Sequence, residues 1–269
     1  MRVEYIGDAT LYLGDCLEKM KDIPDKSIDM ILCDLPYGTT ACKWDIVIPF
    51  EPLWEQYNRI IKDRGAIVLF GSEPFSSYLR MSNIKMYRYD WVWNKITARG
   101  HLVAKIRPMQ QNESISIFGK GKINYYPIME ERDKTITGTE GKRTDIMGGV
   151  STGYTKVYTH KYPKTLLTFK PVYGGLHPTQ KPVALLEYLI RTYTNEGETV
   201  LDNCMGSGST GVACANLGRK FIGIEIEEKY FDIACKRIET AYSQPRLFDD
   251  LEDDKNKPVE QELGLEETL

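Results

Sequence analysis

Short apolar runs alternate along the chain with amphipathic segments, and turn residues separate the two. Each apolar run is too short to be a buried helix, so we expect buried strands. The runs cover residues 28–33, 66–70, 199–201 and 220–224. Pro52 and Pro182 each precede apolar positions at helical spacing, which predicts two helices with proline in the first turn. Strands that alternate with helices favour a parallel sheet in an α/β fold.

Other segments predict smaller elements. Residues 11–13 look like a short strand, and Asp15 can cap the helix that follows, with Glu18 completing a capping box. Residues 89–95 and 114–118 are two more strand candidates. The alternation with helices places them in the same parallel sheet.

The tetrapeptide Asp34-Leu35-Pro36-Tyr37 follows the strand at 28–33, at the carboxyl end where open α/β sheets bind their ligands. The Asp34 carboxylate can accept a hydrogen bond from an amino group. Pro36 keeps Leu35 extended, so the Leu35 carbonyl can act as a second acceptor. Tyr37 offers a flat face to an unstacked base. For the tetrapeptide alone, an ordinary Pro-Tyr turn after a strand is the alternative.

A glycine-rich turn at 202–208 joins the strand at 199–201 to a helical run at 211–217. Such a turn lets a ligand approach the backbone closely at a helix start. The next strand ends in Glu225, about 20 residues further on, where an acid can bind the hydroxyls of a ribose. The combination predicts a site for an adenosine-containing cofactor. A turn needed only for tight packing is the alternative.

The alternation of strands and helices stops between residues 128 and 173. This segment is rich in glycine and threonine, and its tyrosines are interleaved with basic residues. Residues 131–175 contain eight Lys or Arg and four Asp or Glu. Such a stretch can lie along phosphates. A solvated loop is the alternative.

The composition is that of a globular protein, with 42% hydrophobic and 27% charged residues in 269. We find no membrane-length apolar run and no secretory signal, so we expect a cytoplasmic protein. The six cysteines contain no CxxC pair and only three histidines accompany them, so we expect no metal site. Residues 243–269 carry nine acidic and three basic residues, which leaves a mildly basic body with a net charge of +3.

In their order, these motifs resemble the S-adenosylmethionine-dependent DNA amino-methyltransferases of the beta group, in which the catalytic motif precedes the cofactor motif. The tetrapeptide at Asp34 is similar to the family's Asp-Pro-Pro-Tyr, with Leu35 in place of a proline. The glycine turn is similar too, although Asn203 and Cys204 stand where the family has proline and phenylalanine. The other segments that carry the resemblance are 177–182, 112–113, 117–118 and 223–225, with Tyr230, Ala234 and Arg237.

The resemblance implies a Rossmann-like, doubly wound, mostly parallel sheet with a circularly permuted motif order. It places a catalytic half at 1–127, an inserted target-recognition region at 128–173, the cofactor-binding half at 174–242 and an acidic, disordered tail at 243–269. It gives Asp34 and the Leu35 carbonyl the role of orienting the target amino group. Tyr37 and Phe118 would stack on the base. Residues that would contact S-adenosylmethionine are Asp15, Thr179, Lys181, Asp202, Cys204, Gly206, Gly208 and Glu225.

The activity implied is site-specific transfer of a methyl group to N6 of a flipped-out adenine in double-stranded DNA, in a bacterial or phage-infected cell. N4 of cytosine is an alternative target, and RNA or a protein amide is a further one. A homodimer is compatible with the family likeness. The spacing of Gln244, Leu247 and Phe248 is similar to the peptide by which bacterial replication proteins bind the sliding clamp, and a chance match in an acidic tail is the alternative.

Overall fold

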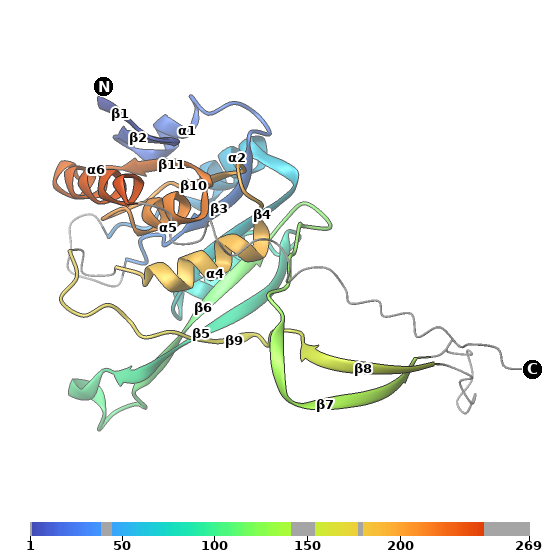
Figure 1. The fold of residues 1–269 in the computed structure, drawn as a ribbon. Coiled ribbons are helices and arrows are strands. Elements are labelled where there is room, and N and C mark those ends of the chain that lie inside the picture. Colours follow the sequence, from blue (N-terminus) through green and yellow to red (C-terminus); the bar gives the residue numbers. More distant parts are fainter. Residues whose placement is uncertain (1, 39–44, 141–153, 177–179, 245–269) are drawn as a thin grey trace, which may run out of the picture.

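The computed structural model describes residues 2–38, 45–140, 154–176 and 180–244 (Figure 1). A nine-stranded sheet forms the centre of the molecule, in the order β1-β2-β11-β10-β3-β4-β6-β5-β9. Its strands are β1 (Arg2–Ile6), β2 (Ala9–Leu13), β11 (Lys220–Glu225), β10 (Thr199–Asp202), β3 (Ile28–Cys33), β4 (Ile61–Gly71), β6 (Gln110–Phe118), β5 (Tyr87–Arg99) and β9 (Leu166–Thr168). The four apolar runs form strands, as predicted, and these strands lie next to one another in the sheet.

All strands of this sheet run in one direction except β1 and β6. The expectation of a mostly parallel sheet is confirmed, but the expectation that β6 is parallel is wrong. β6 pairs antiparallel with both β4 and β5. The reason is the connection from β5 to β6, which contains only the short 3₁₀ turn η1 (His101–Val103). Without a crossover helix the chain has to reverse its direction.

Helices cover both faces of the sheet (Figure 1). One face carries α1 (Cys16–Met20), α2 (Phe50–Ile60) and α3 (Phe75–Ser82), and the other carries α4 (Val183–Tyr193), α5 (Ser209–Leu217) and α6 (Glu228–Ser243). Met30 and Leu32 of β3 belong to the core under α4, α5 and α6, whereas Ile31 and Cys33 belong to the core under α1, α2 and α3. Because successive side chains of a strand point to opposite faces, β3 is buried throughout, and its one charged residue, Asp29, forms an ion pair with Lys62.

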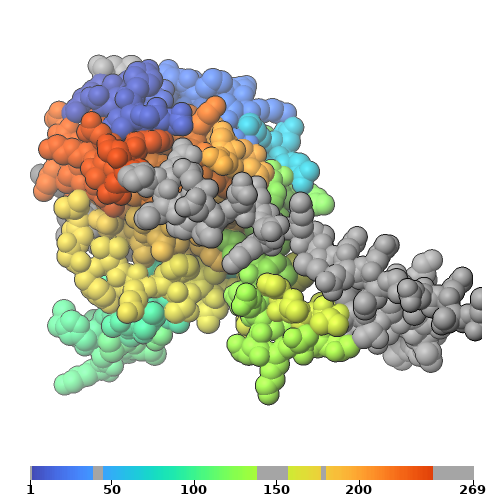
Figure 2. Space-filling view, in the orientation of Figure 1, coloured from blue at the N-terminus to red at the C-terminus, as the bar shows by residue number. Residues whose placement is uncertain are grey.

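A separate two-stranded sheet is formed by β7 (Glu130–Glu140) and β8 (Tyr154–Lys161), which pair antiparallel and project from the body (Figures 1 and 2). β6 ends near the edge that holds the amino ends of the parallel strands, because Phe118 pairs with Ile67. β9 begins beside Val92, which is in register with Ser114 and so with Gly71 at the carboxyl end of β4. The chain from 119 to 165 therefore leaves the sheet at the amino edge and rejoins it on the side of the carboxyl ends. The domain boundaries and the role given to 128–173 stay predictions.

The predicted helix starts are close to the observed ones. Pro182 is the N-cap of α4, and the Asp15 side chain caps α1 by accepting from the backbone N–H groups of Leu17 and Glu18. The Glu18 carboxylate contacts Lys21, so the return bond of the predicted capping box is replaced by an ion pair. Within the described ranges, no helix has the length and apolar character needed to span a bilayer.

Candidate active site

A cavity of about 580 Å³ opens at the carboxyl ends of β3, β10 and β11. Open α/β sheets bind their ligands at this edge. The cavity brings together predicted residues from both halves of the chain. Those that line it are Asp15, Asp34, Leu35, Pro36, Tyr37, Lys181, Asp202, Cys204, Gly206 and Glu225. The amino-group site and the glycine turn therefore share one cavity, as the sequence predicted.

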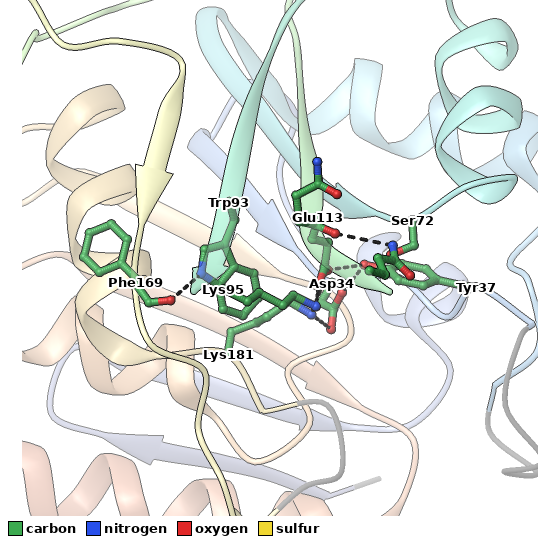
Figure 3. Close-up of polar contacts among 10 residues, drawn as sticks. Asp34, Tyr37, Ser72, Trp93, Lys95, Glu113, Phe169 and Lys181 are labelled. Atoms are coloured by element: carbon green, nitrogen blue, oxygen red, sulfur yellow. Dashed lines mark hydrogen bonds and ion pairs between the residues drawn. The ribbon is translucent and has the colours of Figure 1, made fainter. Parts of the chain in front are cut away.

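Asp34 lies just past the end of β3, in a network of charged groups (Figure 3). The Tyr37 hydroxyl donates to Asp34 Oδ1 at 2.6 Å and lies 2.9 Å from Glu113 Oε1. Lys181 forms an ion pair with Asp34 Oδ2, and its Nζ lies 3.3 Å from Glu113 Oε1. Each carboxylate oxygen can accept about two hydrogen bonds, so Asp34 still has capacity for a substrate N–H.

Glu113 and Lys95, neither of which is among the site residues predicted from the sequence, complete this network. Lys95 Nζ lies 2.6 Å from Glu113 Oε2 and 4.8 Å from the centre of the Trp93 ring. Glu113 is buried near the start of β6. Because β6 is antiparallel, its beginning lies at the carboxyl edge beside Asp34. The pair Asn112-Glu113 in the family resemblance pointed to this position in the sequence. The direction of β6 was needed to place Glu113 beside Asp34.

The buried charges in this network shift one another's pKa values. Burial raises the pKa of the Asp34 carboxyl against the opposing effect of the Lys181 ammonium, and Glu113 adds to the rise. Burial also acts to raise the pKa of Glu113, but Lys181 and Lys95 outweigh it and hold that pKa at about 2. Lys181 itself has a raised pKa because the attraction of Asp34 and Glu113 exceeds the effect of its burial. Two carboxylates and two ammonium groups thus balance one another in a largely buried site.

One face of the Tyr37 ring is already occupied. Phe75 stacks on it with ring centres 4.8 Å apart and planes 27° apart. The expectation that Phe118 lies opposite Tyr37 across the base is wrong. Phe118 is fully buried against Trp54 and Tyr87, and it pairs with Ile67 at the opposite end of the sheet. The antiparallel direction of β6 is the physical reason, because it brings Glu113 rather than Phe118 to the cavity.

The glycine turn connects to the acid at the end of β11 through the backbone. Gly206 has a φ of +51°, and its N–H donates to Glu225 Oε2 at 2.8 Å. Glu225 Oε1 accepts from the N–H of Glu227 at 2.8 Å. Burial raises the pKa of Glu225, although these backbone donors oppose the rise. Two backbone hydrogen bonds therefore fix the carboxylate on the cavity wall, as the predicted ribose acceptor requires.

Gly208 has a different role from the one predicted. A Cβ at this position would lie 2.8 Å from Ala234 Cβ on α6, and the φ of +76° is in the left-handed region. Gly208 does not line the cavity. Its lack of a side chain allows α5 and α6 to pack closely, and of the two glycines only Gly206 lines the cavity.

Lys181 and Thr179 were both expected near the cofactor's carboxylate. Lys181 lines the cavity but is held by Asp34 and Glu113, which places its ammonium in the amino-group site instead. Thr179 lies outside the described residues.

Asp202 lies at the end of β10 with both oxygens bonded. Oδ1 accepts from the Cys204 N–H at 3.1 Å, and Oδ2 accepts from the Thr210 hydroxyl at 2.6 Å. Burial raises the pKa of Asp202 to about 6, against the effect of these hydrogen bonds. A positively charged ligand nearby would favour the ionised form of such a buried carboxylate.

The cavity fits S-adenosylmethionine by its chemistry. Its volume is that of sites for drug-sized ligands. The Glu225 carboxylate can accept hydrogen bonds from a ribose, and the backbone at Gly206 allows a ligand to approach closely. The acids Asp15, Asp202 and Glu225 can attract the positive charge of the cofactor's sulfonium. Among the described residues, no group of three His, Cys, Asp or Glu side chains is arranged to hold a metal ion.

Comparison with known proteins identifies the family. Residues 28–236 match the family described as DNA methylase, whose members methylate N6 or N4 amino groups. The chain belongs to this DNA methylase family. It is 28% identical over 264 residues to the type II methyltransferase M.HinfI of Haemophilus influenzae. That alignment covers 88% of this chain and 70% of M.HinfI. It is 30% identical over 266 residues to the DNA adenine methyltransferase YhdJ of Escherichia coli. That alignment covers 88% of this chain and 86% of YhdJ.

Two solved structures share the fold of this chain. M1.HpyAVI, solved as a complex with SAM, is 27% identical and has a TM-score of 0.59, with 85% of this chain and 99% of that chain covered. The PvuII cytosine-N4-specific DNA methyltransferase has a TM-score of 0.61 at 17% identity, with 88% and 92% covered. The second likeness concerns the fold alone. The Rossmann-like methyltransferase fold predicted from the sequence is thus confirmed.

Proposed function

We propose that this DNA methylase transfers a methyl group from S-adenosylmethionine to N6 of an adenine extruded from double-stranded DNA. The observation that carries the proposal is the common cavity of Asp34 and Glu225, with one amino-group acceptor and one ribose acceptor on its walls. The relative named as a DNA adenine methyltransferase favours adenine over cytosine. A DNA-modifying enzyme of bacterial type acts in the cytoplasm.

In this proposal the cofactor lies between Gly206 and Glu225, with Asp202 and Asp15 near it. When bound, it supplies a methyl group already activated by the sulfonium. The residues of the chain then position the target nitrogen in line with that methyl group at about 3 to 3.5 Å. No covalent intermediate with the base is required.

Asp34 and the Leu35 carbonyl accept the two N–H groups of the target. Both residues line the cavity, and the rigid turn at Pro36 fixes them relative to each other. The accepted hydrogen bonds draw the nitrogen toward a tetrahedral geometry in which its lone pair can attack. Asp34 is also the base that accepts the proton released on methylation. Its raised pKa makes its carboxylate a stronger acceptor than an exposed aspartate.

Tyr37 and Lys181 prepare Asp34 for this role. The hydroxyl of Tyr37 holds Oδ1, and the ammonium of Lys181 keeps the carboxylate ionised in a buried site. Phe75 supports one face of the Tyr37 ring, which leaves the other face to stack on the base. The adenine amino group points into the duplex, so the base has to leave the stack before it can reach Asp34.

The test is to express the protein in a bacterial host that lacks adenine methylation and to map modified bases in its DNA. We expect N6-methyladenine at one recurring sequence, and its loss in Asp34→Asn. The matched control is Asp63→Asn, because Asp63 is an exposed carboxylate beside Lys26 and Lys120 at the far end of β4. N4-methylcytosine in place of N6-methyladenine would overturn the choice of base. If the host contains folded protein but its DNA contains neither N6-methyladenine nor N4-methylcytosine, the proposal is wrong.

The homodimer and the sliding-clamp contact stay predictions. Leu247 and Phe248 lie outside the described residues, which end at Gln244 in this region.

A further inference from the structure

The turn between β5 and β6 carries the two most exposed large hydrophobic side chains in the described part of the chain. Leu102 is 88% exposed and Ile106 is 85% exposed. They lie four positions apart on a compact turn whose N–H groups are bonded locally, from Val103 to Gly100, from Ala104 to His101, and from Ile106 and Arg107 to Val103. The turn is therefore ordered, but it presents its apolar side chains to solvent.

The same turn is strongly basic. Residues 95–110, which we call the basic hairpin, contain Lys95, Arg99, Lys105 and Arg107, with His101 and no acid. Arg99, Lys105 and Arg107 are exposed. Lys105 and Arg107 form no ion pair within the described ranges of the chain. Exposed cations that lack acidic partners are the electrostatic footprint of a polyanion site.

The described strands of the other projection do not share this charge. Residues 130–140 of β7 contain four acids and two bases, and residues 154–161 of β8 contain two Lys and no acid. Their net charge is therefore zero, whereas that of the basic hairpin is +4 with histidine neutral. This difference favours the basic hairpin as a contact for phosphates.

The basic hairpin also begins at the active site. β5 runs parallel to β4 and β3, so the end of β5 lies at the same edge of the sheet as Asp34. Lys95 and Arg99 both line the cavity, and Lys95 contacts Glu113. Seven residues separate Lys95 from Leu102, a reach of at most about 25 Å. Figure 2 shows the tip, in blue-green, standing out from the body at the lower left.

We propose that the basic hairpin contacts the DNA duplex at the place where the target base leaves it. Leu102 and Ile106 lie against the bases next to the gap and stabilise the unstacked state, while Arg99, Lys105 and Arg107 neutralise the flanking phosphates. Apolar side chains on a basic element are how proteins hold an opened base step. This inference rests on the proposed function, since it assigns the surface through which the same active site receives its base.

The first test compares Leu102→Ser/Ile106→Ser with the parent protein on duplex DNA that contains the mapped target sequence. We expect kcat/KM to fall by about ten- to a hundredfold, because two apolar contacts with the opened duplex are lost. On the same duplex with an abasic site opposite the target adenine, where extrusion costs less, we expect activity within about threefold of the parent.

The matched control is Met81→Ser/Ile84→Ser, which also removes two exposed apolar side chains but at the end of α3, near the amino-terminal start of β5. We expect this control to retain parental activity on both duplexes. Equal activity of the hairpin variant and the parent on paired DNA would overturn the inference. A change of oligomeric state in the hairpin variant, measured by sedimentation, with unchanged activity per active site would overturn it as well and assign the tip to self-association.

The second test measures binding to a duplex of unrelated sequence as a function of salt. Arg99→Gln/Lys105→Gln/Arg107→Gln is expected to reduce the slope of log K against log salt by about three, near one unit for each phosphate contact. Lys85→Gln/Lys220→Gln serves as the control with cations removed from the opposite edge, and its slope should not change. An unchanged slope in the triple variant would overturn the inference. Failure of the parent itself to methylate any DNA would instead count against the proposed function.

Discussion

Lys181 forms an ion pair with Asp34, although 147 positions separate the two residues in the sequence. The pair joins the residue that follows β3 to the segment that precedes α4. It also lies in a cavity where Glu113 and Lys95 supply a second pair of opposite charges. The state of Asp34 therefore depends on residues that no local motif connects to it.

Lys181→Met is expected to shift the acidic limb of the pH profile of kcat/KM to higher pH. Lys181 opposes the effect of burial on Asp34, so its removal raises the pKa of Asp34 further and a higher pH is needed to ionise it. The free energy of unfolding at pH 7 is expected to fall by about 3 kcal/mol, because buried carboxylates lose a partner. The measurements are the pH profile and urea denaturation. Lys181→Arg is the control that keeps the charge, and a limb that stays in place in Lys181→Met contradicts the prediction.

Glu225→Gln is expected to weaken S-adenosylmethionine binding at least about tenfold, measured by calorimetry. Both oxygens of Glu225 accept backbone N–H groups, from Gly206 and Glu227, and an amide can satisfy only one of them. The other N–H would face the NH₂ group, and the turn beside the cofactor would shift. Glu228→Gln is the control, since Glu228 is an exposed acid in the first turn of α6. Equal affinities for the two variants would rule out the role given to Glu225.

Asp202→Asn is expected to raise stability and lower cofactor affinity. The pKa of Asp202 in the folded protein is about 6, above that of an unfolded aspartate. The folded state is therefore favoured when Asp202 is protonated, and this stabilisation is lost as the pH rises through 6. At pH 8 the neutral amide should raise the free energy of unfolding by about 1 to 3 kcal/mol.

The stability gain of Asp202→Asn should vanish near pH 4, where Asp202 is protonated in the parent. Denaturant melts at pH 4 and pH 8 measure the difference, and cofactor titration at pH 8 measures the loss of affinity for a cationic ligand. A gain of the same size at both pH values would show that the cost of ionising Asp202 is not its source.

Phe118→Leu is expected to lower the free energy of unfolding by about 1 to 2 kcal/mol and to leave kcat unchanged in the folded protein. Phe118 packs on Trp54 and Tyr87, and it lies at the end of the sheet away from the cavity. Tyr37→Leu should instead lower kcat, because the ring that stacks on the base and the hydroxyl that holds Asp34 are both lost. Thermal melts and steady-state kinetics separate the two effects. A fall in kcat for Phe118→Leu would restore the base-stacking role expected from the sequence.

The elements near the active site could be predicted because their signals are local. The apolar run of β3 is buried on both faces, and it ends where Asp34 begins. Gly206 and Glu225 lie on a turn and a strand end that neighbour each other in a parallel sheet, so their spacing already indicated one site. Short-range sterics and the alternation of strand side chains are sufficient for such predictions.

The wrong placement of Phe118 has its cause in chain direction. Whether the chain after β5 returns antiparallel is decided by its connection and by pairing with β4, and the apolar pattern of β6 is compatible with either direction. That choice brought Glu113 to the cavity and moved Phe118 to the far end. It also created the basic hairpin, whose exposed Leu102 and Ile106 look like ordinary apolar residues in the sequence.

The sequence by itself determined the alternation of strands and helices, the two half-sites and the acids that end β3 and β11, because each follows from a few neighbouring residues. Only the tertiary structure decided which charges meet Asp34, which glycine lines the cavity and which face of Tyr37 is covered by Phe75. These depend on contacts between segments far apart in the chain, where burial and electrostatics act through space.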